Sequence, residues 1–300
     1  MMNIEQIADF GDLCGECPVW DAAAETLYWT DCGGRRFYRY DARRRSAEIL
    51  EADLEINGFR QNRGGGFAMV NNSGIWLWSG PGARPRLIAA EVDGHVCRMN
   101  DCTADSRGRL LAGSWFYDPA AEYPLGCLMR VDPDGAVTVL DEGYRLANGI
   151  AFSPDDSLLY ATDSVARTIY VYDYNAATGE ARNRRVRVAV PAHEGLPDGL
   201  RVDAEGFLWS AQWYGGCVVR YDPDGKAERR IPVPAKQVSC VTFGGRHLYI
   251  TTAGASEPMP VMPPGYDPQT GPFGGPLYRV ETGIQGLPDL PAGISLASSP

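Results

Sequence analysis

The sequence predicts an all-β protein, a six-bladed β-propeller with a metal site on its central axis. The first supporting observation is a repeat, in which a short apolar segment follows a turn rich in Asp, Gly, Asn or Pro and ends in small residues. The repeated segments are Leu27–Thr30, Trp76–Ser79, Leu110–Gly113, Leu159–Thr162, Leu208–Ala211 and Leu248–Thr251. Equivalent positions in successive segments lie 35 to 49 residues apart when Tyr28, Trp76, Leu111, Tyr160, Trp209 and Tyr249 are aligned. This period is typical of propeller blades, which have four strands each.

The second observation is a further strand pattern after most of these segments. Apolar and polar residues alternate there, and Asp-Pro-Asp-Gly turns close two of the segments, a combination typical of strands joined by hairpins. The segments are Phe37–Ala42, Leu128–Gly135, Ile169–Asp173, Val218–Gly225 and Leu277–Val280. Helix patterns are almost absent, because 35 glycines and 22 prolines interrupt the chain. We therefore expect one propeller domain over residues 1–300, closed by N-terminal residues that complete the last blade.

Composition limits the function classes. The chain has 28 Lys and Arg against 38 Asp and Glu, a formal net charge of −10. Nucleic-acid-binding proteins carry basic surfaces instead, and a negative charge also disfavours binding to anionic membranes. The N-terminus lacks the basic and apolar regions of a signal peptide, and no run of 18 apolar residues is present. Eight scattered cysteines do not form a secreted disulfide pattern. We expect a cytoplasmic protein that acts on a small molecule, with no nucleic-acid or membrane partner; the oligomeric state stays open.

Oxygen-bearing side chains precede the repeated segments in a common register. They lie 10 to 12 residues before the aligned positions in five of the six units, at Glu16, Asn100, Asn148, Asp198 and Ser239. The innermost strands of a propeller carry such residues to one mouth of its channel, where two carboxylates would repel each other without a cation. Oxygen ligands suit Ca²⁺ or Mg²⁺, with Mn²⁺ as a further possibility. The alternative is that the Asn-Gly and Asp-Gly pairs are ordinary turns, but their matched offsets favour a site.

Four motifs, in order along the chain, resemble the gluconolactonase and regucalcin family, also called the senescence-marker-protein family. They are Gly15–Trp20, Arg98–Asp101, Ala147–Asp155 and Pro197–Gly206, and the resemblance runs over essentially the whole chain. It implies one divalent metal on the axis, held by Glu16, Asn148 and Asp198, with Asp198 also as the general base. It further implies that Arg98, Asn100 and Asp118 contact a sugar lactone. Cys17 and Cys102 stand where the family has glycine, and we expect both thiols near the rim of the mouth.

The resemblance predicts a metal-dependent hydrolase that opens a sugar lactone, such as gluconolactone, xylonolactone or arabinolactone, to the aldonic acid. The expected cofactor is one divalent ion among Ca, Mg, Mn, Zn and Fe(II). The sequence contains no G-x-S-x-G, H-E-x-x-H or Walker motif, so other nucleophile and phosphate chemistries have no support. Two alternatives stay open: a calcium-binding regulatory propeller, and an organophosphate or ester hydrolase on the same metal site.

Overall fold

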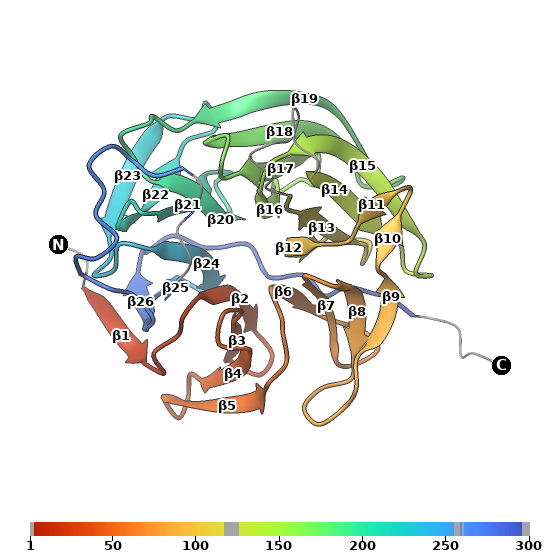
Figure 1. Ribbon diagram of the computed structural model, residues 1–300, viewed down its shortest axis with the longest axis horizontal. Coiled ribbons are helices and arrows are strands. Elements are labelled where there is room, and N and C mark those ends of the chain that lie inside the picture. The colour runs from red at the N-terminus through yellow and green to blue at the C-terminus, as the bar shows by residue number, and fades with distance from the viewer. Residues whose placement is uncertain (1–2, 117–125, 255–258, 260, 296–300) are drawn as a thin grey trace.

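Six four-stranded antiparallel sheets surround a central axis as the blades of a propeller (Figure 1). The computed structural model describes residues 3–116, 126–254, 259 and 261–295. These residues form 26 strands and, within those ranges, no helix; accordingly, no helix of the described chain is long and apolar enough to cross a membrane. The expected all-β, six-bladed architecture is confirmed.

The blades follow one another along the chain. Blade 1 contains β2 (Gly15–Asp21), β3 (Thr26–Asp31), β4 (Arg36–Asp41) and β5 (Ser46–Ala52); blade 2 contains β6 (Gly58–Gln61), β7 (Phe67–Asn71), β8 (Gly74–Trp78) and β9 (Arg86–Ala89). Blade 3 contains β12 (Met99–Ala104), β13 (Leu110–Ser114), β14 (Gly126–Val131) and β15 (Val137–Tyr144). Between blades 2 and 3, β10 (Glu91–Val92) and β11 (His95–Val96) form a small hairpin.

The second half of the ring repeats this order. Blade 4 contains β16 (Ala147–Phe152), β17 (Leu158–Asp163), β18 (Thr168–Asn175) and β19 (Glu180–Ala189); blade 5 contains β20 (Leu196–Val202), β21 (Leu208–Trp213), β22 (Cys217–Tyr221) and β23 (Ala227–Pro232). Blade 6 contains β24 (Val238–Gly244), β25 (His247–Thr252), β26 (Leu277–Glu281) and the N-terminal β1 (Ile4–Ala8). The pairing of β1 with β26, with Ile4 opposite Val280, confirms that N-terminal residues close the ring.

Blade 2 corrects the sequence-based register. Trp76 was expected in the second strand of its blade, but it lies in β8, the third strand. The second strand is β7, whose Ala68 pairs with Arg60 of the inner strand as Trp209 pairs with Arg201 in blade 5. Both β7 and β8 are short apolar segments, so their local pattern does not reveal their order. With Ala68 as the aligned position, the spacings around blade 2 become 40 and 43 residues, close to those of the other blades.

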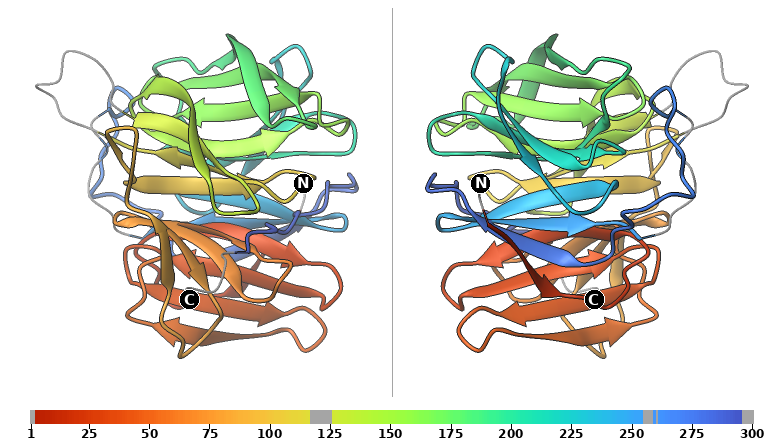
Figure 2. Two further views of the ribbon diagram at one scale, coloured as in Figure 1. Left: turned by 90° about the vertical axis from the view of Figure 1, so that its right-hand side faces the viewer. Right: turned by 90° about the vertical axis from the view of Figure 1, so that its left-hand side faces the viewer.

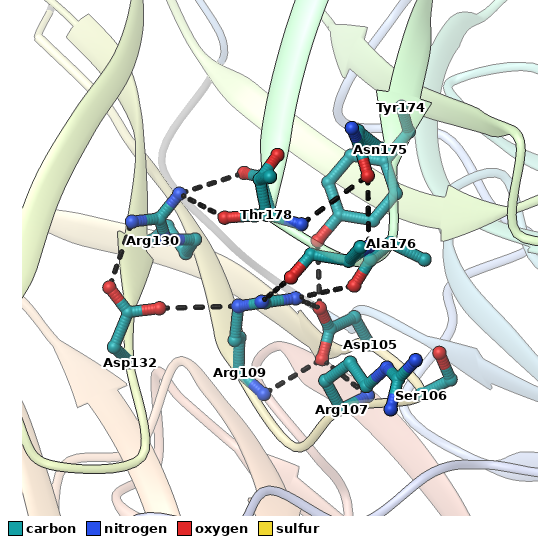
Figure 3. Close-up of polar contacts among 12 residues, drawn as sticks. Asp105, Ser106, Arg107, Arg109, Arg130, Asp132, Tyr174, Asn175, Ala176 and Thr178 are labelled. Atoms are coloured by element: carbon teal, nitrogen blue, oxygen red, sulfur yellow. Dashed lines mark hydrogen bonds and ion pairs between the residues drawn. The ribbon is translucent and has the colours of Figure 1, made fainter.

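Packing between neighbouring blades includes a polar cluster where blade 3 meets blade 4 (Figure 3). The guanidinium of Arg109 donates to Asp105 Oδ2 at 2.8 Å and to the backbone oxygen of Ala176 at 2.9 Å. The hydroxyl of Tyr174 donates to the same Asp105 oxygen at 2.7 Å. Because Asp105 and Arg109 flank the β12–β13 turn while Ala176 follows β18, these bonds fix the two blades against each other.

The C-terminal segment of residues 284–295, here called the C-terminal strap, crosses one opening of the ring (Figures 1 and 2). It forms backbone bridges from Gly286 to Asp203 and from Ala292 to Asn62, beyond the ends of inner strands β20 and β6. The carboxylate of Asp289 accepts hydrogen bonds from Trp20 N at 2.8 Å and Thr242 Oγ1 at 2.7 Å. The strap therefore ties several blades together at the end of the channel where the inner strands finish.

Candidate active site

The candidate site residues lie where the inner strands begin, at the opposite end of the channel from the strap. Five inner strands change pairing register at these positions, between Glu16 and Val19, Met99 and Asp101, Asn148 and Ile150, Pro197 and Leu200, and Val238 and Cys240. A β-bulge of this kind leaves a residue unpaired and turns its side chain out of the regular alternation. The bulges explain how successive blades direct polar side chains toward the axis.

Glycines permit the inner strands to converge here. A Cβ atom on Gly149 would lie 2.3 Å from the backbone oxygen of Asp198, and one on Gly199 would lie 2.3 Å from Cys240 Sγ. Gly149 also has φ +26°, in the region that L side chains rarely adopt. The Asn-Gly and Asp-Gly pairs are therefore required by close strand contact at the axis, and they do not act as ordinary turns.

A cavity of about 300 Å³ opens at this end of the channel. It is lined by Cys14, Glu16, Cys32, Asn57, Asn100, Trp115, Arg145, Leu146, Asn148, Val165, Asp198, Trp213 and Met259. Four of the residues singled out from the sequence, namely Glu16, Asn100, Asn148 and Asp198, are thus brought together. A second hollow of about 320 Å³ is lined by Tyr214, Lys236, Tyr266 and Phe273 among others, and none of its lining residues within the described chain is acidic.

Glu16 and Asp198 form the acidic part of the cavity. Asp198 is 2% exposed, and burial raises its pKa well above the usual range, with the nearby Asp101 charge acting in the same direction. Burial, followed by the charge of Asp198, likewise raises the pKa of Glu16. Asn148 Nδ2 donates a hydrogen bond to Ser164 Oγ at 3.2 Å, which fixes its amide. Two acids that disfavour each other's ionised form are ready to accept a cation.

The donor set fits a divalent cation. Asp198 Oδ1 is buried without a hydrogen-bond partner, and such an atom costs free energy unless something binds it. Within the described ranges, no three His, Cys, Asp or Glu side chains come close enough to hold a metal ion. A metal in this cavity would therefore need the amide oxygen of Asn148 beside the carboxylates of Glu16 and Asp198, an all-oxygen set that suits hard cations.

Of the expected substrate contacts, Asn100 lines the cavity with these acids, whereas Arg98 lies next to a lining residue. Asn100 lines the cavity, and its Nδ2 donates a hydrogen bond to the backbone oxygen of Ala147 at 3.2 Å. This bond fixes the orientation of the side-chain amide, including its carbonyl oxygen. Arg98 is exposed, and its guanidinium stacks on the ring of Trp115, a lining residue, at 4.2 Å. Asp118, the third expected contact, lies outside the described residues. Position and chemistry agree with the expected roles of Arg98 and Asn100, which stay predictions.

Sequence reasoning missed two polar residues of the cavity, Asn57 and Arg145. Asn57 directly precedes β6, and it was overlooked because the wrong strand of blade 2 was aligned. The signal was present, since Asn57-Gly58 repeats the pattern of Asn148-Gly149. Arg145 occupies the short connection before β16, and nothing in its neighbourhood in the sequence marks it as a cavity residue.

Cys17 and Cys102 do not lie at the rim, as was expected, but are buried with exposures of 1% and 0%. Cys17 Sγ accepts hydrogen bonds from Arg60 Nη1 at 3.2 Å and Phe59 N at 3.3 Å. Burial opposes ionisation of Cys17, but the hydrogen bond with Cys102 and the charge of Arg60 lower its pKa to about 7. Cys17 has φ 45°, a left-handed conformation that favours glycine, the residue that the resemblance leads one to expect at this position.

A six-bladed propeller with two acids, the half-buried Glu16 and the buried Asp198, and three amides around one mouth of its channel has a candidate site for a small molecule and a metal ion. The chain belongs to the SMP-30/Gluconolactonase/LRE-like family, whose model matches residues 14–254. The family predicted from the four motifs is confirmed.

Similar proteins include two with curated enzyme names. A pentonolactonase (XacC) of Haloferax volcanii is 36% identical over 98% of this chain and 100% of its own. A 6-deoxy-6-sulfogluconolactonase of Pseudomonas putida is 34% identical over 80% of this chain and 83% of its own. Among solved structures, a luciferin-regenerating enzyme superimposes with a TM-score of 0.85 at 28% identity, over 98% of this chain and 100% of its own. The predicted enzyme class, a lactonase, agrees with the names of the first two relatives.

Proposed function

We propose that the protein is a metal-dependent lactonase that opens a sugar lactone to the corresponding aldonic acid. The observation that carries the proposal is the pair of acids in the cavity, the half-buried Glu16 and the buried Asp198, with an unpartnered carboxylate oxygen on Asp198. Lactonase names among relatives of similar length support the reaction class. Because one relative is named a pentonolactonase, five-carbon lactones such as xylonolactone and arabinolactone are the first substrates to test, with gluconolactone beside them.

Glu16, Asn148 and Asp198 would hold the divalent ion, which when bound supplies Lewis-acid stabilisation of negative charge on the lactone oxygen. Asp198 is buried next to the reacting end of the substrate and accepts a proton from the attacking water, a contribution of typically ~10²–10⁴-fold in rate. Asn100 and Arg98 orient the sugar, because an amide both donates and accepts while a guanidinium presents several donors in a fixed plane. The apolar lining residues Leu146 and Val165 exclude bulk water from this side of the cavity.

The test is a pH-indicator assay with xylono-, arabino- and gluconolactone, an aryl ester and a phosphotriester. Each is assayed with metal-free protein and after the addition of Ca²⁺, Mg²⁺, Mn²⁺, Zn²⁺ or Fe²⁺. We expect lactone opening that is lost on chelation and restored by at least one ion. Lactone turnover by protein shown to be metal-free by elemental analysis would contradict the metal requirement. Turnover of the phosphotriester or aryl ester, with no turnover of the lactones, would favour the ester-hydrolase alternative. Calcium binding without turnover of any substrate would favour the regulatory alternative.

The predicted cytoplasmic location is tested separately by cell fractionation.

A further inference from the structure

Two exposed arginines, Arg98 and Arg145, lie at the opening of the cavity. Arg145 lines the cavity and is exposed, and Arg98 is exposed with its guanidinium stacked on Trp115. Neither guanidinium forms an ion pair or hydrogen bond with any part of the chain that the structure describes. The charge of Arg145 opposes the rise that burial causes in the pKa of Asp163, but the guanidinium is not held by an ion pair within the described residues, so it stays available to an anionic ligand at the cavity.

The backbone of Arg145 is firmly held. Its N–H donates to Asp163 Oδ2 at 3.0 Å, and the next N–H, of Leu146, donates to Asp163 Oδ1 at 3.4 Å. The backbone oxygen of Arg145 accepts a hydrogen bond from Phe116 N at 3.3 Å. Only two residues, 145 and 146, connect β15 to β16. Because the connection is short and bonded on both sides, the side chain starts from a fixed point and loses less freedom when it binds a ligand.

The positions of the acids and of Arg145 define an orientation for the substrate. Asp198 and Asn148 are 2% and 5% exposed, deep in the cavity, whereas Arg145 is at its exposed edge. The reaction proposed above brings the ring carbonyl of the lactone to Asp198. The end of the sugar remote from that carbonyl then points toward the entrance, where Arg145 can reach it. The carboxylate formed on ring opening stays at the acidic end, so it is not the group that Arg145 meets.

We infer that the lactonase prefers a sugar lactone that carries a phosphate or sulfonate group at the end remote from the ring carbonyl, and that Arg145 is the specificity residue that binds this group. The planar guanidinium matches two oxygens of such an anion at once. Arg98 adds a second positive charge at the same entrance. The inference rests on the proposed lactonase function and names its substrate class.

The experiment compares D-glucono-1,5-lactone with its 6-phosphate, using the metal-loaded protein. For the wild-type protein we expect a kcat/KM at least about tenfold higher for the phosphorylated lactone, since hydrogen bonds to charged groups are the stronger ones. This preference should shrink as NaCl is raised from 50 to 500 mM, because salt screens exposed charges. Arg145→Met should remove most of the preference by raising KM for the phosphorylated substrate, and Arg145→Lys should retain part of it.

Arg107→Met is the matched control. Arg107 is also exposed, but it lies in the β12–β13 turn at the strap end of the channel, so its removal changes the net charge equally and should leave both kcat/KM values unchanged. Equal kcat/KM of the wild-type protein for the two lactones, or a preference that Arg145→Met and Arg107→Met alter equally, would overturn the inference while the lactonase proposal stands. If the protein opened neither gluconolactone nor its 6-phosphate with any of the metals, and opened neither pentonolactone in the same assay, the proposed function would fall together with this inference.

Discussion

The guanidinium of Arg98 lies 4.2 Å from the ring centre of Trp115, and this stack places the positive charge at the edge of the cavity. Trp115 is itself oriented, because its indole N–H donates to Asn72 Oδ1 at 2.9 Å. The arrangement links blade 2, which carries Asn72, to Arg98, which directly precedes the inner strand of blade 3. Trp115 therefore acts as a positioning residue for Arg98.

Replacing Trp115 should loosen Arg98 without affecting the metal. We expect Trp115→Ala to raise KM several-fold with a smaller change in kcat, because an exposed cation–π contact contributes about 0.5–1 kcal/mol. Trp115→Phe keeps an aromatic face and should show a smaller effect. Steady-state kinetics with a neutral pentonolactone measures both values. A large fall in kcat with unchanged KM would contradict a positioning role.

Two variants should distinguish the residues that bind the metal from those that contact the substrate. Glu16→Gln should weaken metal affinity, because it removes one of the two carboxylates of the proposed ligand set. Arg98→Ala should leave the metal in place and lower kcat/KM, because Arg98 is proposed to contact the sugar and not the ion. Elemental analysis after dialysis measures the first effect and kinetics the second. Loss of metal from Arg98→Ala with retention in Glu16→Gln would reverse the assigned roles.

How far the sequence predicted this site depends on how local each signal is. The inner-strand residues Glu16, Asn148 and Asp198 were found because each lies 11 or 12 residues before the aligned aromatic residue of a repeated segment. Asn57 was missed for one reason, the misplacement of Trp76 in the second strand of blade 2. Strand order within that blade is decided by hydrogen-bonded pairing between segments, which a local apolar pattern does not encode.

Features that depend on contacts between distant segments were beyond the sequence pattern. The C-terminal strap has no alternating pattern, and its role follows from Asp289 reaching Trp20 and Thr242, which are far from it in the chain. The burial of Cys17 likewise results from the approach of Arg60 from the next blade. Arg145 carries no motif, and only the cavity lining reveals it.

The strap makes a prediction about stability. Asp289 Oδ1 lies 3.3 Å from Arg201 Nε, and the side chains are only 6% and 10% exposed. Asp289→Ala would leave the Arg201 charge buried without its partner, so we expect a loss of about 3–5 kcal/mol in the free energy of unfolding. Asp289→Asn keeps an acceptor and should lose less. Urea unfolding gives both values, while metal affinity should not change, because the strap lies at the other end of the channel.

Asp12 predicts a specific pH dependence. Burial raises its pKa to about 6 despite hydrogen bonds from Tyr38 and Trp29, at 2.5 and 3.1 Å. Asp31 adds to the rise, and Arg36, 3.6 Å away, opposes it.

The pKa of Asp is about 4 in an unfolded chain. Between this pH and about pH 6, the Asp12 carboxyl is more fully protonated in the folded protein than in the unfolded chain. The contribution of Asp12 to stability is therefore complete below pH 4 and is lost as the pH rises through 6, by up to about 3 kcal/mol. Asp12→Asn cannot titrate there. The melting temperature of the wild-type protein minus that of Asp12→Asn should fall between pH 4 and pH 7. A difference that is constant with pH would show that the carboxyl of Asp12 is not shifted.

The cysteines divide into two groups that alkylation can distinguish. Cys17 and Cys102 are buried, whereas Cys14 and Cys32 line the cavity and are half-buried. Cys217 is half-buried too but lies in β22, away from the cavity. In the folded protein we expect iodoacetamide to label Cys14, Cys32 and Cys217 and to spare Cys17 and Cys102 until the chain is unfolded.

A ligand bound in the cavity should protect the two cavity thiols from alkylation. The hydrogen bond with Cys32, together with burial, raises the pKa of Cys14 well above that of a free thiol, and the thiolate is the form that reacts. Labelling of Cys14 should therefore accelerate as the pH rises from 7 to 9. A bound aldonic acid fills the cavity and should slow labelling of Cys14 and Cys32, while Cys217 reacts at its usual rate. Mass-spectrometric mapping measures all three. If Cys17 were labelled before Cys14 in the folded protein, the channel below Glu16 would be open to solvent. That result would contradict the burial of Cys17.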